Sequence, residues 1–277
     1  MSEASGAQSA LGTYRSSFSS LLQPKTILLL FYDLLFWALF FVGLIAYPRL
    51  LEHTTNSLDS MGDNLIAGLQ NAQAMTAGET VMRVFLLSFI ALTVAWILWS
   101  LLAWTFTRGM IWQLLTGNNR WSVRIWVKFF FLNLLWFVLV AALWLLVFGV
   151  MGKIVPYGSF AYPGNAPWLL LTAFVLLLGT WYFTEILNYM FVLRGTIFGT
   201  LRETLFVGAR KFRALVPAYL AVIGTFLLLM VAAYALRLLP EQLSNVIAAI
   251  LLLLFAAWMR EYLIGKFSAI APEWVVH

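Results

Sequence analysis

The sequence predicts an all-α polytopic membrane protein with six transmembrane helices. Hydrophobic residues make up 63% of the 277 residues and charged residues only 10%, whereas a soluble domain carries about a quarter charged residues. Six apolar stretches are long enough to cross a hydrocarbon core, which takes roughly 20 helical residues. None alternates apolar and polar residues as a barrel strand does. A single transmembrane domain over 1–277 follows, and a soluble enzyme, a disordered chain and a coiled coil are excluded.

The spans are expected as helices because a helix satisfies its own backbone hydrogen bonds in lipid. They are predicted over residues 27–47, 84–106, 129–150, 168–192, 215–236 and 243–264.

Before the first span, one helical face carries an apolar series at positions i, i+4, i+7 and i+8, made of Tyr14, Phe18, Leu21 and Leu22. This pattern predicts a short helix on the membrane surface that leads into the span. The start lacks the basic region and cleavage site of a signal peptide, so we expect the first span to stay uncleaved.

The distribution of Lys and Arg predicts the orientation. Thirteen of the 17 basic residues fall in the N-terminal segment, the second and fourth connections and the C-terminal tail, and four fall on the other side. Both termini are therefore expected in the cytoplasm, in a multi-pass protein of the cytoplasmic (plasma) membrane. Because this positive-inside pattern accounts for the net charge of +6, no nucleic-acid partner is expected.

The outer connection 48–83 carries apolar residues at helical spacing, namely Leu58, Met61, Leu65, Ile66 and Leu69. Two alternatives stay open for it. It forms an outer amphipathic helix or cap, or it offers a docking surface for a protein partner. The connection 151–167, which is rich in Pro and Gly, is expected to be a turn-rich loop.

An internal repeat has a period of 86 residues, because the motif Arg-Gly-x-Ile-aromatic at 108–112 recurs at 194–198. Each copy opens a basic and apolar segment of the kind that lies among lipid headgroups. Three units of an elbow helix followed by a helical hairpin are predicted, over 11–107, 108–193 and 194–266. The headgroup-facing residues are expected to be Arg120, Arg124, Lys128, Arg210, Lys211 and Arg213.

The segment 194–212 resembles the elbow of a loose group of prokaryotic six-helix membrane proteins of unknown function, the YciC-type proteins and their relatives. The opening of the first span, Phe-Tyr-Asp-Leu-Leu-Phe-Trp at 31–37, is similar to that of hypothetical archaeal membrane proteins. The resemblance implies a six-helix fold in a membrane and no particular activity.

Ionisable residues inside a span are costly, so they invite a functional interpretation. Asp33 and Glu185 lie at similar depth in the inner half of the bilayer, by counting residues from the span ends. We expect one intramembrane polar cluster, made of Asp33, Asn133, Glu185, Asn188 and Arg260. Two interpretations stay open. In one, the cluster lines a cavity that faces the cytoplasm and binds a cation, a proton or a lipid headgroup. In the other, Asp33 and Glu185 form ion pairs with Arg260, Arg194 or another basic residue, and these pairs stabilise the helix bundle.

Catalysis has little support in the sequence. Cysteine is absent and the only histidines are His53 and His277, so no metal site, haem or thiolate chemistry is expected. No nucleotide motif and no motif of a lipid-modifying enzyme occurs. We therefore expect a non-enzymatic protein without a cofactor, whose partners are anionic membrane lipids. Its expected role is a lipid-interacting scaffold or accessory subunit, and the alternative is a small transporter or channel around Asp33 and Glu185.

Overall fold

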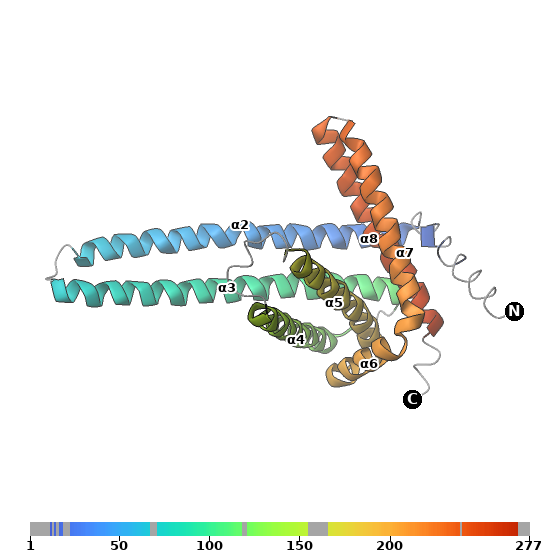
Figure 1. Ribbon diagram of the computed structural model, residues 1–277, viewed down its shortest axis with the longest axis horizontal. Helices are drawn as coiled ribbons and strands as arrows, with labels where there is room; N and C mark the ends of the chain where they lie inside the picture. The colour runs from blue at the N-terminus through green and yellow to red at the C-terminus, as the bar shows by residue number, and fades with distance from the viewer. Residues whose placement is uncertain are drawn as a thin grey trace. The chain divides into compact units, whose positions relative to one another are not determined.

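The computed structural model describes residues 23–66, 71–117, 121–154, 166–238 and 240–270, together with Gly12, Tyr14, Ser17 and Phe18. The described residues contain no strand and fold almost entirely as helix (Figure 1). The helices are α2 (Pro24–Ile66), α3 (Asn71–Thr116), α4 (Val123–Ile154), α5 (Ala166–Arg194), α6 (Ile197–Arg210), α7 (Phe212–Ala235), the short 3-10 helix η2 (Leu236–Leu238) and α8 (Glu241–Ile270). The predicted all-α class is confirmed.

Six of these helices are long and apolar enough to cross a membrane. The candidate spans are Pro24–Asn56, Glu79–Thr116, Val123–Met151, Leu170–Arg194, Phe212–Ala235 and Glu241–Ala269. Each contains its predicted span or matches it to within three residues at either end. At most 22% of the most apolar stretch of each is buried inside the protein, which leaves apolar surface for lipid. By helix length and composition, the chain is a multi-pass integral membrane protein.

The chain divides into two compact units, a hairpin unit of Asp33–Thr107 and a larger unit of Met1–Tyr32 with Arg108–His277. Each unit is described by itself. The three repeat units predicted from the sequence stay a prediction.

In the hairpin unit, α2 and α3 lie side by side and antiparallel (Figure 1). The indole nitrogen of Trp99 donates to the Leu39 carbonyl at 2.8 Å, and the hydroxyls of Tyr47 and Thr93 lie 3.1 Å apart. With 43 and 46 residues, the two complete helices measure about 65 and 69 Å, more than twice a hydrocarbon core of about 30 Å.

The region predicted as the outer connection 48–83 contains no separate helix in its described part. Instead α2 continues through it to Ile66, and α3 begins at Asn71. The side chains of Leu58, Met61, Leu65, Ile66 and Leu69 lie outside the described residues. A docking surface in this region therefore stays a prediction.

The two copies of the period-86 motif differ in local structure. Residues 108–112 continue the helix α3, whereas a break at Gly195, with a φ of 64° that favours glycine, separates α5 from α6. The equivalent Gly109 is needed for another reason, because a side chain there would collide with the ring of Trp126. Only the second copy is followed at once by a separate elbow helix.

The helix α6 folds back against the last turns of α5. Leu201 packs with Leu187 and Phe191, and further along α6 the Gly208 carbonyl accepts a hydrogen bond of 2.8 Å from the Tyr182 hydroxyl. The earlier residue of α6 thus contacts later residues of α5, and the later residue of α6 contacts an earlier residue of α5, so the two helices are antiparallel.

Small buried residues allow this close approach. Thr200, Thr204 and Gly208 recur every four residues on the buried face of α6, a spacing typical of tightly packed membrane helices. A side chain at position 208 would meet the ring of Phe183. The contact therefore depends on the size of these three residues.

Before α2, Tyr14 and Phe18 pack against α7 and α8 within the larger unit. The hydroxyls of Tyr14 and Thr225 lie 2.9 Å apart, and the ring of Phe18 stacks on Trp258 with centroids 4.9 Å apart. Tyr14 and Phe18 are helical and share one face, as predicted. Leu21 and Leu22 lie outside the described residues.

We predict that Gly208→Leu destabilises the protein by about 1–3 kcal/mol, the usual cost of overpacking a close contact. The adjacent Ala209 is exposed, so Ala209→Leu is the matched control and should leave stability nearly unchanged. Thermal unfolding in detergent, followed by tryptophan fluorescence, measures both. Equal midpoints for the two variants would contradict the close packing of α6 on α5.

Candidate functional site

The five residues of the predicted intramembrane polar cluster are all buried. Asp33 belongs to the hairpin unit, and Asn133, Glu185, Asn188 and Arg260 belong to the larger unit. Each of the four lies on α4, α5 or α8. A cluster that joins all five stays a prediction, because the two units are described separately.

The two buried asparagines differ in their hydrogen bonds. Asn133 donates its side-chain amide to the Phe129 carbonyl of its own helix at 2.8 Å. Asn188 is fully buried, and neither its amide nitrogen nor its amide oxygen has a hydrogen-bond partner among the described residues. Buried polar atoms of this kind are rare and call for an explanation.

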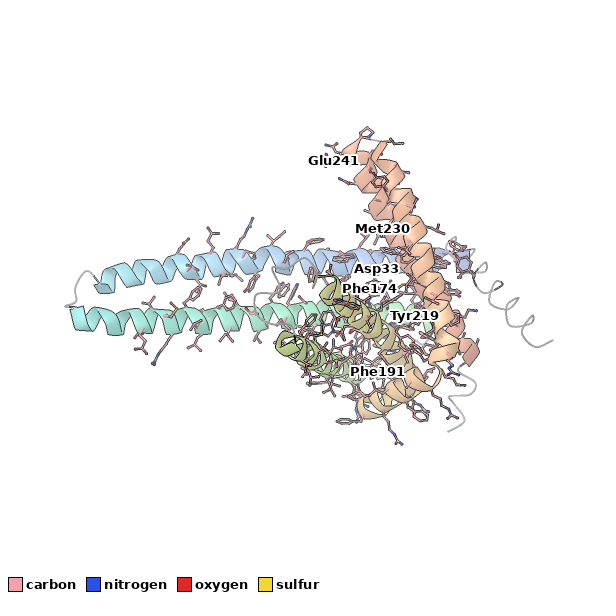
Figure 2. All side chains as sticks on the ribbon, in the orientation of Figure 1. Asp33, Phe174, Phe191, Tyr219, Met230 and Glu241 are labelled. Carbon is pink, nitrogen blue, oxygen red and sulfur yellow. The ribbon has the colours of Figure 1, made fainter. Side chains whose placement is uncertain are left out.

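Glu185 is 4% exposed and stands one helical turn before Asn188 on α5. Residues three apart share a helix face. Tyr182 lies one turn before Glu185 on the same helix. Tyr219 donates its hydroxyl to the Tyr182 carbonyl at 3.3 Å. Figure 2 places Tyr219 on α7, so α5 and α7 together contribute the polar groups at this point.

Two ion pairs stabilise the larger unit. Lys25 at the start of α2 pairs with Glu261 of α8 at 2.9 Å, and Arg194 at the end of α5 pairs with Glu203 of α6 at 2.9 Å. The pairing of Asp33 and Glu185 with a basic residue stays a prediction.

The basic residues predicted to face headgroups fall into three groups. Arg120 lies outside the described residues. Arg124 is exposed at the start of α4, and the Lys128 side chain approaches the Gly195 carbonyl at 3.4 Å. Arg210 and Arg213 are exposed around the junction of α6 and α7, and Lys211 between them is partly buried. This end of the larger unit is strongly basic.

An aromatic and basic stripe on α6 was predicted only in part, because Arg210 alone of its residues was expected to face headgroups. Phe198, Arg202, Phe206 and Arg210 recur every four residues, and all four are exposed. The Arg210 guanidinium lies 5.7 Å from the centre of the Phe206 ring. The i, i+4 spacing is visible in the sequence and could have identified the stripe.

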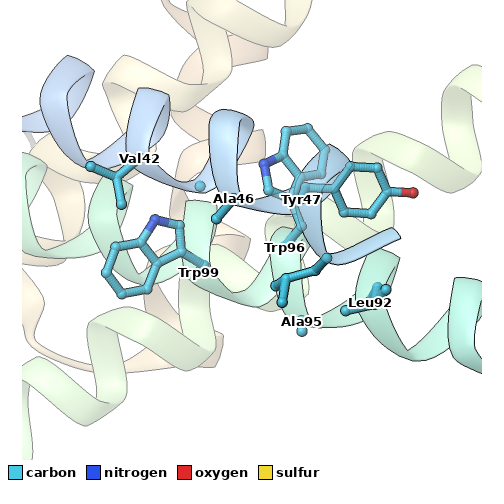
Figure 3. A pocket seen from close by; sticks show the side chains of 9 residues that line it. Val42, Ala46, Tyr47, Leu92, Ala95, Trp96 and Trp99 are labelled. Carbon is cyan, nitrogen blue, oxygen red and sulfur yellow. The ribbon is translucent and has the colours of Figure 1, made fainter. Parts of the chain in front are cut away.

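The hairpin unit holds a pocket of about 280 Å³ (Figure 3). It is lined by Val42, Gly43, Ala46, Tyr47, Leu50, Leu92, Ala95, Trp96 and Trp99. The tyrosine hydroxyl and the Trp99 nitrogen already have the partners described above. No charged side chain among the described residues lines the pocket, which is apolar apart from these groups and the Trp96 nitrogen.

Among the described residues, no group of three or more His, Cys, Asp and Glu side chains could hold a metal ion. No family model matches the chain, and no curated protein and no solved structure matches it either. The resemblance to YciC-type proteins therefore stays a prediction.

We predict that Lys25→Glu and Glu261→Lys each destabilise the protein by about 1–3 kcal/mol, between the values for exposed and buried ion pairs. The double exchange should recover most of the loss, because it restores opposite charges. The exposed pair Arg83–Glu79 is the control, and its single reversals should cost less than about 1 kcal/mol. A double exchange no more stable than the single variants would refute the pairing.

Proposed function

We propose that the protein is a non-enzymatic integral membrane protein that binds anionic lipid headgroups through α6. Its role is a lipid-interacting scaffold or accessory subunit of the cytoplasmic membrane, with both termini in the cytoplasm. The observation that carries the proposal is the exposed stripe of Phe198, Arg202, Phe206 and Arg210.

The chemistry of the stripe suits the boundary between headgroups and acyl chains. Phe198 is 79% exposed and Phe206 61% exposed, which is costly in water but favourable among acyl chains. Arginine binds phosphate oxygens through two parallel hydrogen bonds, and it stacks on aromatic rings. Each arginine of the stripe has an aromatic residue one turn before it, so the same face supplies both interactions.

The surrounding charges support the same interpretation. On α6 and at the neighbouring helix ends, the described residues include the acid Glu203 and seven basic residues, namely Arg124, Lys128, Arg194, Arg202, Arg210, Lys211 and Arg213. Basic residues near an anionic leaflet contribute about 1 kcal/mol each. The opposite face of α6 is held by α5, so the stripe is fixed in place before a lipid binds.

The proposal predicts that Arg202→Gln with Arg210→Gln lowers anionic lipid binding on the order of tenfold. The protein is purified in mild detergent from a membrane that holds phosphatidylglycerol and phosphatidylethanolamine. Native mass spectrometry then compares how much of each lipid stays bound.

The matched control is Arg49→Gln with Arg83→Gln, which removes the same charge from exposed positions of the hairpin unit. This double variant should retain phosphatidylglycerol as the wild type does. Equal losses in both double variants would show that net charge alone holds the lipid, and no loss in either would remove the proposed role of α6.

An accessory role also needs a protein partner, and the long hairpin supports one. The sequence of the hairpin between the two spans carries the acidic residues Glu52, Asp59, Asp63 and Glu79, so these helical segments are polar enough to leave the bilayer. A second candidate function, a small transporter or channel, is favoured by one observation, the buried polar groups of Glu185 and Asn188.

A further inference from the structure

The buried polar groups on α5 have no role in the proposed lipid binding. Glu185 and Asn188 lie on one face of a membrane-spanning helix, and they are 4% and 0% exposed. Both polar atoms of the Asn188 amide lack a hydrogen-bond partner among the described residues. A carboxylate and an unsatisfied amide together in a low-dielectric core require a compensating group.

The surroundings are aromatic and apolar on the side of α7. The ring of Tyr219 lies 5.0 Å from that of Trp181 and 4.9 Å from that of Tyr182, centroid to centroid. The Tyr219 hydroxyl donates its hydrogen to the Tyr182 carbonyl, so the lone pairs of its oxygen remain available. These rings exclude water, and the Tyr219 oxygen lies against α5 one helical turn before Glu185.

We propose that Glu185, Asn188 and Tyr219 bind a small monovalent metal cation of the size of Na⁺. The donors would be the carboxylate, the amide oxygen and the phenol oxygen, the hard ligands that such cations take. One positive charge balances the carboxylate, and a water retained by the ion gives the Asn188 nitrogen an acceptor. The site is independent of the lipid-binding stripe on α6.

The chain offers a matched control for this site. Asn133 is as deeply buried as Glu185, and it lies in the same unit, but its amide is already bonded to the Phe129 carbonyl. Replacing it removes a buried amide without touching the proposed cation site. The wild type, Glu185→Gln, Asn188→Leu and Asn133→Leu therefore form one series.

The experiment is a thermal titration of each purified protein in detergent at fixed pH and ionic strength, with N-methylglucamine chloride replaced stepwise by NaCl. A ligand that binds the folded state raises the unfolding midpoint with its concentration. We expect a saturable rise of a few degrees in the wild type and in Asn133→Leu, and none in Glu185→Gln or Asn188→Leu. A parallel KCl titration should give a smaller rise.

Two results would overturn the proposal. One is a wild type whose midpoint does not respond to Na⁺. The other is a Glu185→Gln variant that responds as the wild type does, which would leave Glu185 with a purely structural role. If the α5 variants do not fold, equilibrium dialysis of the wild type against radioactive Na⁺ decides, with one ion bound per chain in support and none against.

Discussion

The close contact of α6 with α5 is the interaction on which the rest of the larger unit depends. The last turns of α5 contribute to two apolar clusters at once. One joins Ile186 and Met190 to α3, α6, α7 and α8, and the other joins Leu187 and Phe191 to α4 and α6. Without the small residues of α6, the second cluster would open and the stripe on the far side of α6 would lose its support.

This arrangement separates two kinds of surface on one short helix. The buried face of α6 carries hydroxyls and glycine, which suit close packing, whereas the exposed face carries rings and guanidinium groups. A bilayer has the same separation, with acyl chains beneath and phosphates above. The helix is therefore matched to its neighbour on one side and to lipid on the other.

The sequence predicts the six spans well because a bilayer demands long apolar helices, and composition alone reveals these. It does not reveal how far the helices continue. The helix α2 continues through polar residues to Ile66, and α3 already begins at Asn71. The hydropathy of these polar segments is too low to predict a span. Local propensity is a weak guide in such polar segments.

The candidate sites, too, could be predicted from the sequence only in part. Glu185 and Asn188 could be found from the sequence because polar residues stand out within an apolar span, and the structure buries both. The pairing of Lys25 with Glu261 joins residues 236 positions apart, and no local pattern indicates it. The stripe on α6 could be predicted only in part. The sequence indicates a basic and apolar elbow and includes Arg210, but only the packing of α6 on α5 shows which residues form its exposed face.

The most direct test of the account is the depth of α6 in a bilayer. The chain has no cysteine, so single cysteines at 198, 202, 204 and 206 can carry spin labels in reconstituted liposomes. Collision rates with oxygen and with a water-soluble nickel complex measure depth. The account predicts labels at headgroup depth for 198, 202 and 206, and an immobile, inaccessible label at 204. Labels at 198, 202 and 206 that are as accessible to nickel as those on a helix in water would contradict it.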